Sequence, residues 1–510
     1  MTAMWRFIAT VFSKGSKATR SLCLSLPAQW LGIMAKRGTS PLPALIRRPP
    51  PDGYSVFHFL PMSLQPLLPL LIATPGALFL MLGIIWLLGG HVSERVMSRI
   101  TKATYAFLTF LTIMIGWSMV SGGMHTERVA LGDWFTVANY GYSLSLLIDR
   151  LSLPLVGITV VLAGIVGSFS VRYLHRDPGF YRFFLLLHLF TFGALLVFTA
   201  DSLDLLIVGW EIVGITSVLL VAFFQYRPDP VRNALWVFAS YRAADLFMLL
   251  AIFLAHHWFG TTSWAGMFSG DWPDCGNKLN GTASTLIAVL LVIAAGGKSS
   301  QGPFCGWLPR AMEGPTPSSA IFYGAISVHA GAYLLLRIEP MIHQSMIATS
   351  FVIFIGLTTA FLGTLIHRTC ADAKTSLAYA AQTQLGLIFA EIGFGWTTFA
   401  VIHLVGHAML RTLQFLRAPS MLRDYHRVHA AAGGKLNPTG GCYESLLPPA
   451  LQIWLYRWAL GRGFYDAIVE RWIVAPLQTL ARGLAIFEPE FLPQQPAAKP
   501  ATHGVETPVS

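Results

Sequence analysis

Charged side chains are scarce in this sequence of 510 residues: Asp, Glu, Lys and Arg make up 12% of it, and hydrophobic residues make up 54%. A soluble domain typically carries about twice that charged fraction. Several uninterrupted apolar stretches reach the roughly 20 residues that a helix needs to cross hydrocarbon. We therefore expect an all-α protein that crosses the membrane many times.

The sequence also lacks the patterns that hold metals and cofactors. Its cysteines are scattered, with neither a C-x-x-C motif nor a Cys/His metal spacing, which argues against an iron–sulfur cluster, a haem attachment site and a structural zinc. No G-x-G-x-x-G follows a strand pattern, so a nucleotide site is not expected. The net charge of +11 is better explained by basic cytoplasmic loops than by a nucleic-acid partner. We expect no bound cofactor or metal, and the five cysteines are Cys23, Cys275, Cys305, Cys370 and Cys442.

Apolar stretches predict about eleven transmembrane helices. Lys and Arg concentrate in the loops that follow the odd-numbered stretches, which the positive-inside rule places in the cytoplasm. The stretches are 65–89, 103–121, 148–169, 180–200, 203–224, 233–257, 283–299, 316–337, 346–366, 375–394 and 397–416.

The ends of the chain differ in composition from its apolar middle. The N-terminal extension is basic and proline-rich. The loop count places it outside the cytoplasm, whereas its positive charge favours the cytoplasmic side. It would be a processed targeting segment, an extra interfacial helix or an upstream extension with Met62 as the true start, and we favour the last. The predicted division is an extension at 1–61, a transmembrane domain at 62–424, a Gly/Pro-rich linker at 425–448, an amphipathic interfacial helix at 449–487 and a disordered tail at 488–510.

Lys298 ends a charge-free run that begins at Thr285. A lysine at the centre of a membrane helix costs about 2.5–3.5 kcal/mol on insertion scales, so such residues usually serve a function. Glycines and prolines follow it closely, including Gly302, Pro303 and Pro309. They predict a broken helix, and a buried charge beside a broken helix is typical of an ion or proton site.

Three further charges are predicted inside the membrane before Lys298. Glu211 lies in the middle of an apolar stretch, where it would either hold a neighbouring helix or pair with a cation, most simply Lys298. Arg242 and Asp245 are three residues apart on one helical face. They would form a structural intrahelical pair or flank the site of Glu211.

His403, His407 and Arg411 fall at intervals of four and therefore share one side of a predicted helix. A single buried histidine is often a packing donor, but two above an arginine indicate a proton relay, because histidine titrates near neutral pH. Zinc binding by two histidines alone would lack a third ligand. Arg411 cannot pass on a proton, since guanidinium stays protonated in proteins.

His329, Lys374 and Glu391 complete the set of ionisable residues in the predicted membrane region. Together with the residues above they predict a lateral row through the centre of the helix bundle. The sequence alone does not place them near one another in space.

Three motifs identify a family resemblance. GWEIVGITSVLL (209–220), AAGGKSSQGPFCGWLPRAMEGPTPSSA (294–320) and VIHLVGHAMLRTLQF (401–415) resemble the NuoL-like, antiporter-type subunits of respiratory complex I, Mrp antiporters and membrane hydrogenases. The similarity covers about 65–425, with a weaker echo at 464–477. The central block is too long and specific to arise by chance in apolar sequence.

The resemblance implies a fold and a function. Family members fold as two inverted five-helix repeats, each with one broken helix, and conduct protons without a bound cofactor. The residues matching Glu211 and Lys298 form the family's central ion pair, and its two histidines match His403 and His407. It implies a multi-pass subunit of the bacterial inner (plasma) membrane that has no catalytic site of its own.

This sequence departs from the family pattern at three places. Arg411 stands where a lysine usually follows the histidine pair, which puts a simple lysine relay in doubt. Tyr323 stands where a histidine usually follows the broken helix, and His329 comes further along. The second broken helix, with its lysine, is missing after 416, so the second repeat looks truncated.

A shortened member of about this length resembles DabB, the membrane subunit of the Dab inorganic-carbon uptake system. That resemblance implies proton-coupled uptake of CO2 or bicarbonate with a large soluble or peripheral partner, DabA-like, that carries a carbonic-anhydrase-like zinc site. The alternatives are a subunit of a quinone- or hydrogen-linked redox complex, a stand-alone cation/proton antiporter, and a structural scaffold. The sequence does not decide between H⁺ and Na⁺.

Overall fold

The fold is that of a computed structural model, which describes residues 64–90, 92–137, 140–418 and 447–464, and residues 471, 476 and 479. The predicted extension 1–61 and tail 488–510 lie outside the described residues, as does nearly all of the predicted linker 425–448. The long helices are α2 (Leu64–Leu87), α3 (Glu94–Ser121), α4 (Ser152–Tyr173), α5 (Phe180–Thr199), α6 (Leu203–Val221), α7 (Pro228–Phe259), α9 (Gly281–Lys298), α14 (Met346–His367), α15 (Ala373–Gly393), α16 (Thr397–Arg417) and α19 (Pro449–Leu460).

The protein is a helical, multi-pass membrane protein, as the sequence predicts. In the described part of the chain, nine helices are long and apolar enough to cross a membrane. Of the eleven predicted stretches, only 316–337 and 375–394 are not among them. The second is one helix, α15, whose polar residues lower its hydropathy. Several predicted limits were too narrow, since α7 runs from Pro228 to the left-handed Gly260 that ends it.

The prediction of one continuous helix over 316–337 was wrong. Short turns α10 (Trp307–Arg310), η3 (Ala311–Glu313), α11 (Thr316–Ser318) and η4 (Ser319–Tyr323) follow α9, and helical pairing resumes only in α12 (His329–Arg337). The predicted break after Lys298 is confirmed, because α9 ends at that residue. Prolines before and at the start of this stretch lack a backbone N–H and prevent one helix from running on from α9. The break inside 316–337 lies at 324–328, which contain no proline.

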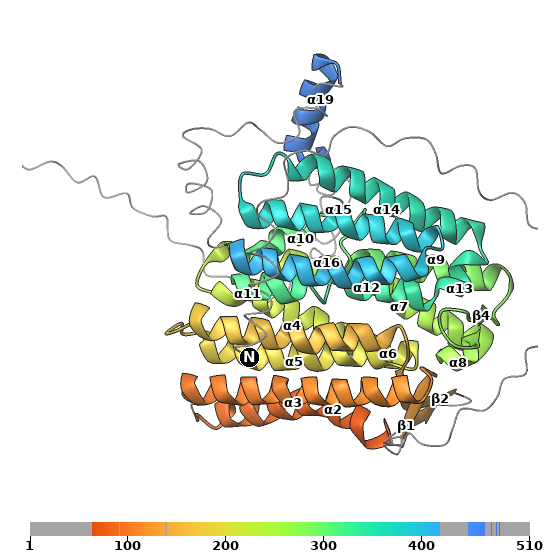
Figure 1. Cartoon of the computed structure of the whole chain (residues 1–510). Coiled ribbons are helices and arrows are strands. Elements are labelled where there is room, and N and C mark those ends of the chain that lie inside the picture. Colours follow the sequence, from red (N-terminus) through yellow and green to blue (C-terminus); the bar gives the residue numbers. More distant parts are fainter. Residues whose placement is uncertain are drawn as a thin grey trace, which may run out of the picture. The chain divides into compact units, whose positions relative to one another are not determined.

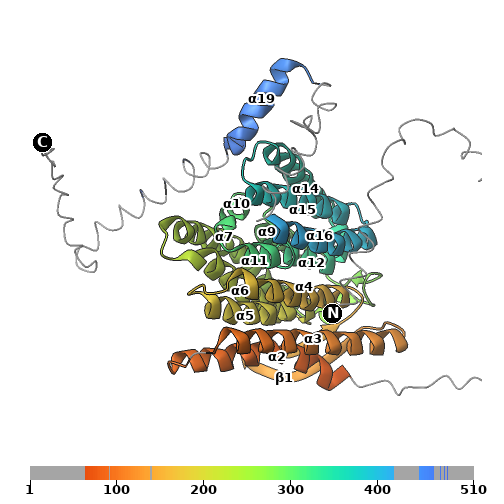
Figure 2. The same cartoon turned by 60° about the vertical axis from the view of Figure 1, so that its left-hand side comes forward.

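Helices that are neighbours in sequence form the closest pairs, and these pairs surround the broken segment. In Figures 1 and 2, α2 and α3 lie beside α4 and α5, while α14 and α15 lie on the other side of α9 and α12. Helix α16 packs against α4, α12 and α15. Helix α7 packs closely along α9. The elements that carry Glu211, Lys298, His329 and His407 are therefore neighbours.

Two short antiparallel sheets and three further short turns complete the described part. A hairpin of β1 (Glu127–Val137) and β2 (Tyr140–Ile148) joins α3 to α4, and this hairpin was not predicted. The second sheet pairs β3 (Phe268–Ser269) with β4 (Gly276–Asn277) after α8 (Trp264–Met267). The turns are η2 (Ala222–Phe224), α13 (Glu339–His343) and η6 (Arg462–Phe464). Of the predicted amphipathic helix 449–487, the structure describes α19, which packs against α14.

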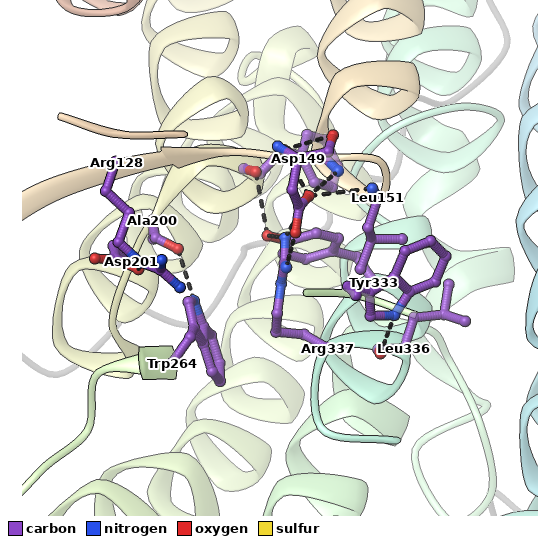
Figure 3. Close-up of polar contacts among 12 residues, drawn as sticks. Arg128, Asp149, Leu151, Ala200, Asp201, Trp264, Tyr333, Leu336 and Arg337 are labelled. Atoms are coloured by element: carbon purple, nitrogen blue, oxygen red, sulfur yellow. Dashed lines mark hydrogen bonds and ion pairs between the residues drawn. The ribbon is translucent and has the colours of Figure 1, made fainter. Parts of the chain in front are cut away.

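A buried ion pair fixes the far end of α12 to the start of α4. Figure 3 shows the side chain of Arg337 directed at Asp149, and Arg337 also donates to the hydroxyl of Tyr333 at 3.0 Å. Asp149 accepts backbone hydrogen bonds from Leu151 (3.1 Å) and Ser152 (2.8 Å). Because every member of this group is buried, the pair holds α12 in one position relative to α4.

Candidate functional site

Lys298 is buried to 1% exposure at the end of α9. Its ammonium donates to the carbonyl oxygen of Trp210 at 3.1 Å and lies 5.0 Å from the Trp210 ring centre and 4.4 Å from that of Tyr241. Among the described residues, no carboxylate oxygen forms an ion pair with it within 4.0 Å. A carbonyl oxygen and two aromatic faces only partly replace the solvation that this buried ammonium loses.

Two glycines allow α9 to approach its neighbours closely enough to place Lys298 there. A Cβ atom on Gly297 would lie 2.0 Å from the Cβ of Ala244 on α7. A Cβ atom on Gly331 of α12 would lie 2.3 Å from the carbonyl oxygen of Ala295. Neither position tolerates a side chain, so the packing of α7, α9 and α12 depends on both glycines.

The carboxylates near Lys298 are held by Arg242. Its guanidinium forms an ion pair with Glu211 on α6 and another with Asp245 on its own helix at 2.9 Å. Asp245 also accepts from the indole nitrogen of Trp210 at 2.6 Å. Trp210 therefore links the carboxylates to Lys298, because its indole N–H donates to Asp245 and its carbonyl oxygen accepts from Lys298.

The pairing inside this cluster differs from the one that the sequence suggested. We took Lys298 as the simplest partner of Glu211, and the structure places Arg242 there instead. The two alternatives for Arg242 and Asp245 both hold, because the residues pair within α7 and also flank Glu211. Sequence spacing showed the pair on one face but could not show which helix faces it.

The end of α9 and the start of α12 are joined directly. The hydroxyl of Ser299, which follows Lys298, donates to the carbonyl oxygen of Val328 at 2.6 Å, and His329 is the next residue. Trp307 fills the space beside the break and donates to Gly297 at 2.9 Å. The hydrogen bond between Ser299 and Val328 thus connects the residue after Lys298 with the residue before His329.

His329 and His407 share a hydrogen bond across two helices. Nε2 of His329 lies 2.8 Å from Nδ1 of His407, and both rings are buried. On the other side of His407, Nε of Arg411 donates to Nε2 at 3.3 Å. Three of the predicted residues therefore form one continuous chain.

His403 belongs to a separate group on the same face of α16. Its Nδ1 lies 2.8 Å from a carboxylate oxygen of Glu391, and its Nε2 lies 3.0 Å from the side-chain oxygen of Gln384. The rings of His403 and His407 are 6.4 Å apart between centres. The shared helix face was predicted from the spacing, but the two histidines have different partners.

Lys374 contacts the broken segment rather than a histidine. Its ammonium donates to the carbonyl oxygens of Met312 (2.6 Å) and Gly314 (2.8 Å) in the broken segment. It holds unpaired backbone carbonyls that the break exposes, which is a structural task. Its place at the start of α15 gave no signal of this contact.

Sequence reasoning missed Trp210 and Tyr241, which contact Lys298, and Gln384, which contacts His403. Trp210 and Tyr241 read as ordinary aromatic packing, and Gln384 reads as one polar residue in an apolar stretch. A signal existed only for Gln384, because it lies seven residues before Glu391 and so shares its helix face. The contacts of Trp210 and Tyr241 depend on helix packing.

These features define a class: a multi-pass helical membrane protein with ionisable residues inside the bundle around a broken helix. The chain matches the family described as "NADH:quinone oxidoreductase/Mrp antiporter, TM" over residues 200–439. It matches "NADH-Ubiquinone oxidoreductase (complex I), chain 5 N-terminus" over residues 134–184.

The protein belongs to this antiporter-type family of membrane subunits. It is 30% identical over 423 residues to a "Probable inorganic carbon transporter subunit DabB1" of Halothiobacillus neapolitanus, covering 81% of this chain and 72% of the relative. It is 31% identical over 382 residues to "NADH-ubiquinone oxidoreductase chain 5" of Neurospora crassa, covering 73% of this chain and 51% of the relative. The chain spans about half the length of such fungal relatives.

Two solved structures share the fold. The Mrp complex from Dietzia sp. DQ12-45-1b contains a chain with a TM-score of 0.58 and 28% identity, covering 68% of this chain and 37% of that chain. A chain of the membrane-bound sulfane sulfur reductase, an archaeal respiratory membrane complex, has a TM-score of 0.56 and 20% identity, covering 68% of this chain and 70% of that chain. At 20% identity the second likeness concerns the fold alone.

Proposed function

We propose that this protein translocates protons through its bundle and couples their gradient to a partner protein. The observation that carries the proposal is Lys298, a buried amine at the end of a broken helix without an ion-pair partner among the described residues. Such an amine gains and loses a proton readily, because the charged form is poorly compensated. The carboxylates held by Arg242 lie near it, and Ser299, the next residue, donates to Val328, which precedes His329.

The route that we propose joins His407 and His329 through Lys298 to the cluster of Glu211, Arg242 and Asp245. The Glu211 and Arg242 side chains remain 26% and 35% exposed near the middle of α6 and α7. Hydrocarbon cannot solvate an ion pair at that depth. We therefore propose that another membrane-embedded subunit covers this face in the assembled complex.

We propose that the proton gradient drives the uptake of CO2 or bicarbonate across the bacterial inner membrane. The support is the match to the DabB1 relative, of which the chain covers 72% of the length, against about half of the complex I relatives. We propose a zinc-containing, DabA-like soluble partner, which would carry the carbon chemistry. A proton-pumping subunit of a quinone- or hydrogen-linked complex is the second candidate, supported by the number of chain 5 relatives.

Isolation of the native complex separates the two candidates. The protein would be tagged in its own host, solubilised gently and purified, and its partners would be identified by mass spectrometry and metal analysis. A zinc-containing soluble partner, together with loss of growth at low CO2 after deletion, supports carbon uptake. Iron–sulfur subunits, together with loss of redox-driven proton pumping, support the second candidate and contradict the first.

A further inference from the structure

All three nitrogens of the Arg411 guanidinium are engaged. Nε donates to Nε2 of His407 at 3.3 Å, Nη1 donates to the side-chain oxygen of Gln414 at 2.8 Å, and Nη2 donates to the carbonyl oxygen of Ala380 at 2.8 Å. Arg411 is 8% exposed. These contacts come from α15 and α16, so the guanidinium is held in one orientation beside His407.

This contact determines where the protons on the two central histidines lie. A guanidinium has donors and no acceptor, so Nε2 of His407 must accept and carries no proton. A neutral His407 then carries its proton on Nδ1, which lies 2.8 Å from Nε2 of His329. His407 donates in that bond, His329 accepts, and His329 carries its own proton on Nδ1.

We propose that Arg411 is a positioning residue that holds His407 neutral, with its proton on Nδ1, and thereby keeps the histidine relay closed at rest. The proposal rests on the proposed proton conduction and adds a gate to it. A proton can enter His407 only at Nε2, where Arg411 donates. Arg411 cannot accept that proton, so the guanidinium must withdraw before the relay conducts.

Each passage of a proton changes the state of this gate. His407 gains a proton at Nε2 and gives its Nδ1 proton to Nε2 of His329. His329 then passes its own Nδ1 proton to a neutral Lys298, the next group of the proposed route. Afterwards Nε2 of His407 is a donor and faces the Nε–H donor of Arg411. Two donors cannot bond to each other, so Arg411 stays displaced until the ring returns to its first tautomer. Conduction would therefore proceed one proton at a time.

Among the described residues, Arg411 is the donor that contacts Nε2 of His407. On α16 the facing ionisable groups are His403 and Arg411, on α12 it is His329, and on α15 it is Glu391, which contacts His403. The ring centres of His403 and His407 are 6.4 Å apart, and no hydrogen bond joins them among the described residues. Arg411 is therefore the guanidinium that contacts His407, while His403 contacts Glu391.

Nitrogen NMR of ¹⁵N-histidine in the native complex tests the tautomers without any transport assay. His407 is assigned by its loss in His407→Gln. We expect a protonated Nδ1 and an unprotonated Nε2 in the wild type, a mixture of tautomers in Arg411→Met, and the wild-type pattern in Arg411→Lys. A wild-type His407 that carries its proton on Nε2, or on both nitrogens, overturns the proposal, and so does an unchanged pattern in Arg411→Met.

Proton leak in vesicles tests the gate itself. We expect Arg411→Met to raise the leak about tenfold, the order expected when one hydrogen bond from a charged donor is lost. Arg172→Met, at an exposed arginine in the last turn of α4, is the control and should leave the leak unchanged. An unchanged or lower leak in Arg411→Met contradicts the gate. If no variant or wild type conducts while the tautomers are as expected, the proposed function fails and the tautomer assignment stands.

Discussion

Arg242 forms the ion pair with Glu211 in the middle of the membrane domain. The same guanidinium holds Asp245 at 2.9 Å, so one arginine serves two carboxylates. Lys298 is left with a carbonyl oxygen and two aromatic rings. Arg242 keeps its charge and holds both carboxylates. On the proposed function, this leaves Lys298 as the group that changes its protonation state.

Removing the charge of Arg242 should reduce proton flux strongly. Arg242→Met leaves two carboxylates without their shared cation, and we expect flux to fall at least about tenfold, a change of 1.4 kcal/mol. Arg242→Lys should fall less but not match the wild type, because an ammonium cannot hold both carboxylates in a fixed fork. Flux is measured with a pH-sensitive dye in vesicles that hold the complex.

A double-mutant cycle shows whether Glu211 and Arg242 act as one unit. The combination of Glu211→Gln with Arg242→Met should reduce flux by less than the product of the two single effects, because the two variants remove the same ion pair. Additive losses would mean that the two residues contribute independently and that the ion pair has no role in conduction.

Glu391→Gln should lower proton flux by about tenfold, because it removes the charge of a charge-assisted hydrogen bond to His403. The hydrogen-bonding shape of the side chain is kept, so folding should be little affected. Glu339→Gln is the matched control, since Glu339 is equally buried but contacts Thr397 and His343. Equal losses in both variants would contradict a specific role for Glu391.

Lys374→Met should destabilise the protein without changing the flux of folded molecules. The variant loses two hydrogen bonds from an ammonium to backbone carbonyls. A hydrogen bond from a charged group contributes about 1.5–3 kcal/mol to the free energy of unfolding. Unfolding in detergent, followed by tryptophan fluorescence, measures the first effect. A loss of flux as large as that of a Lys298 variant would return Lys374 to the proton row where the sequence placed it.

Asp149→Asn should lower the free energy of unfolding by about 3–5 kcal/mol, because Arg337 would remain buried without its counter-ion. Combining it with Arg337→Met should recover most of that loss, since an apolar pair of similar volume replaces the ions. The measurement is chemical unfolding in detergent. A double variant as unstable as Asp149→Asn would show that the ion pair is not the source of the effect.

The same aspartate gives a pH dependence with a definite sign. Burial raises the pKa of Asp149, but the charge of Arg337 and the hydrogen bonds from Arg337 and Ser152 lower it more, so the pKa lies below its usual 3.8. The stabilisation is present above about pH 4 and is lost as the pH falls through the lowered value. Asp149→Asn should abolish this loss.

Asp201 provides the opposite case on the same side of the molecule. Burial raises its pKa above the usual 3.8, and the nearby Arg128 only partly offsets this. Its contribution to stability is present at low pH and is lost as the pH rises through the raised value. Asp201→Asn should therefore steepen the acid loss that Asp149 causes. A flatter acid profile in Asp201→Asn would contradict this assignment.

The sequence predicts the spans and the break well, because long apolar runs and clustered prolines and glycines act locally. Lys298 and the shared face of His403 and His407 follow from the same local patterns. The partners do not: Arg242 beside Glu211, His329 beside His407 and Lys374 beside Met312 all depend on which helices pack together. Helix periodicity gives a face but not the neighbour of that face. The interruption of the helix predicted over 316–337 depends on how the whole broken segment packs, which local sequence patterns do not show.

Proton flux through the complex carrying Lys298→Arg tests the central claim most directly. Arginine keeps the positive charge in the site and does not release a proton, so assembly should persist while flux falls to the background of vesicles without the complex. Lys102→Arg, at an exposed lysine of α3, should keep wild-type flux. Full flux through an assembled Lys298→Arg complex would contradict the claim that Lys298 carries the proton.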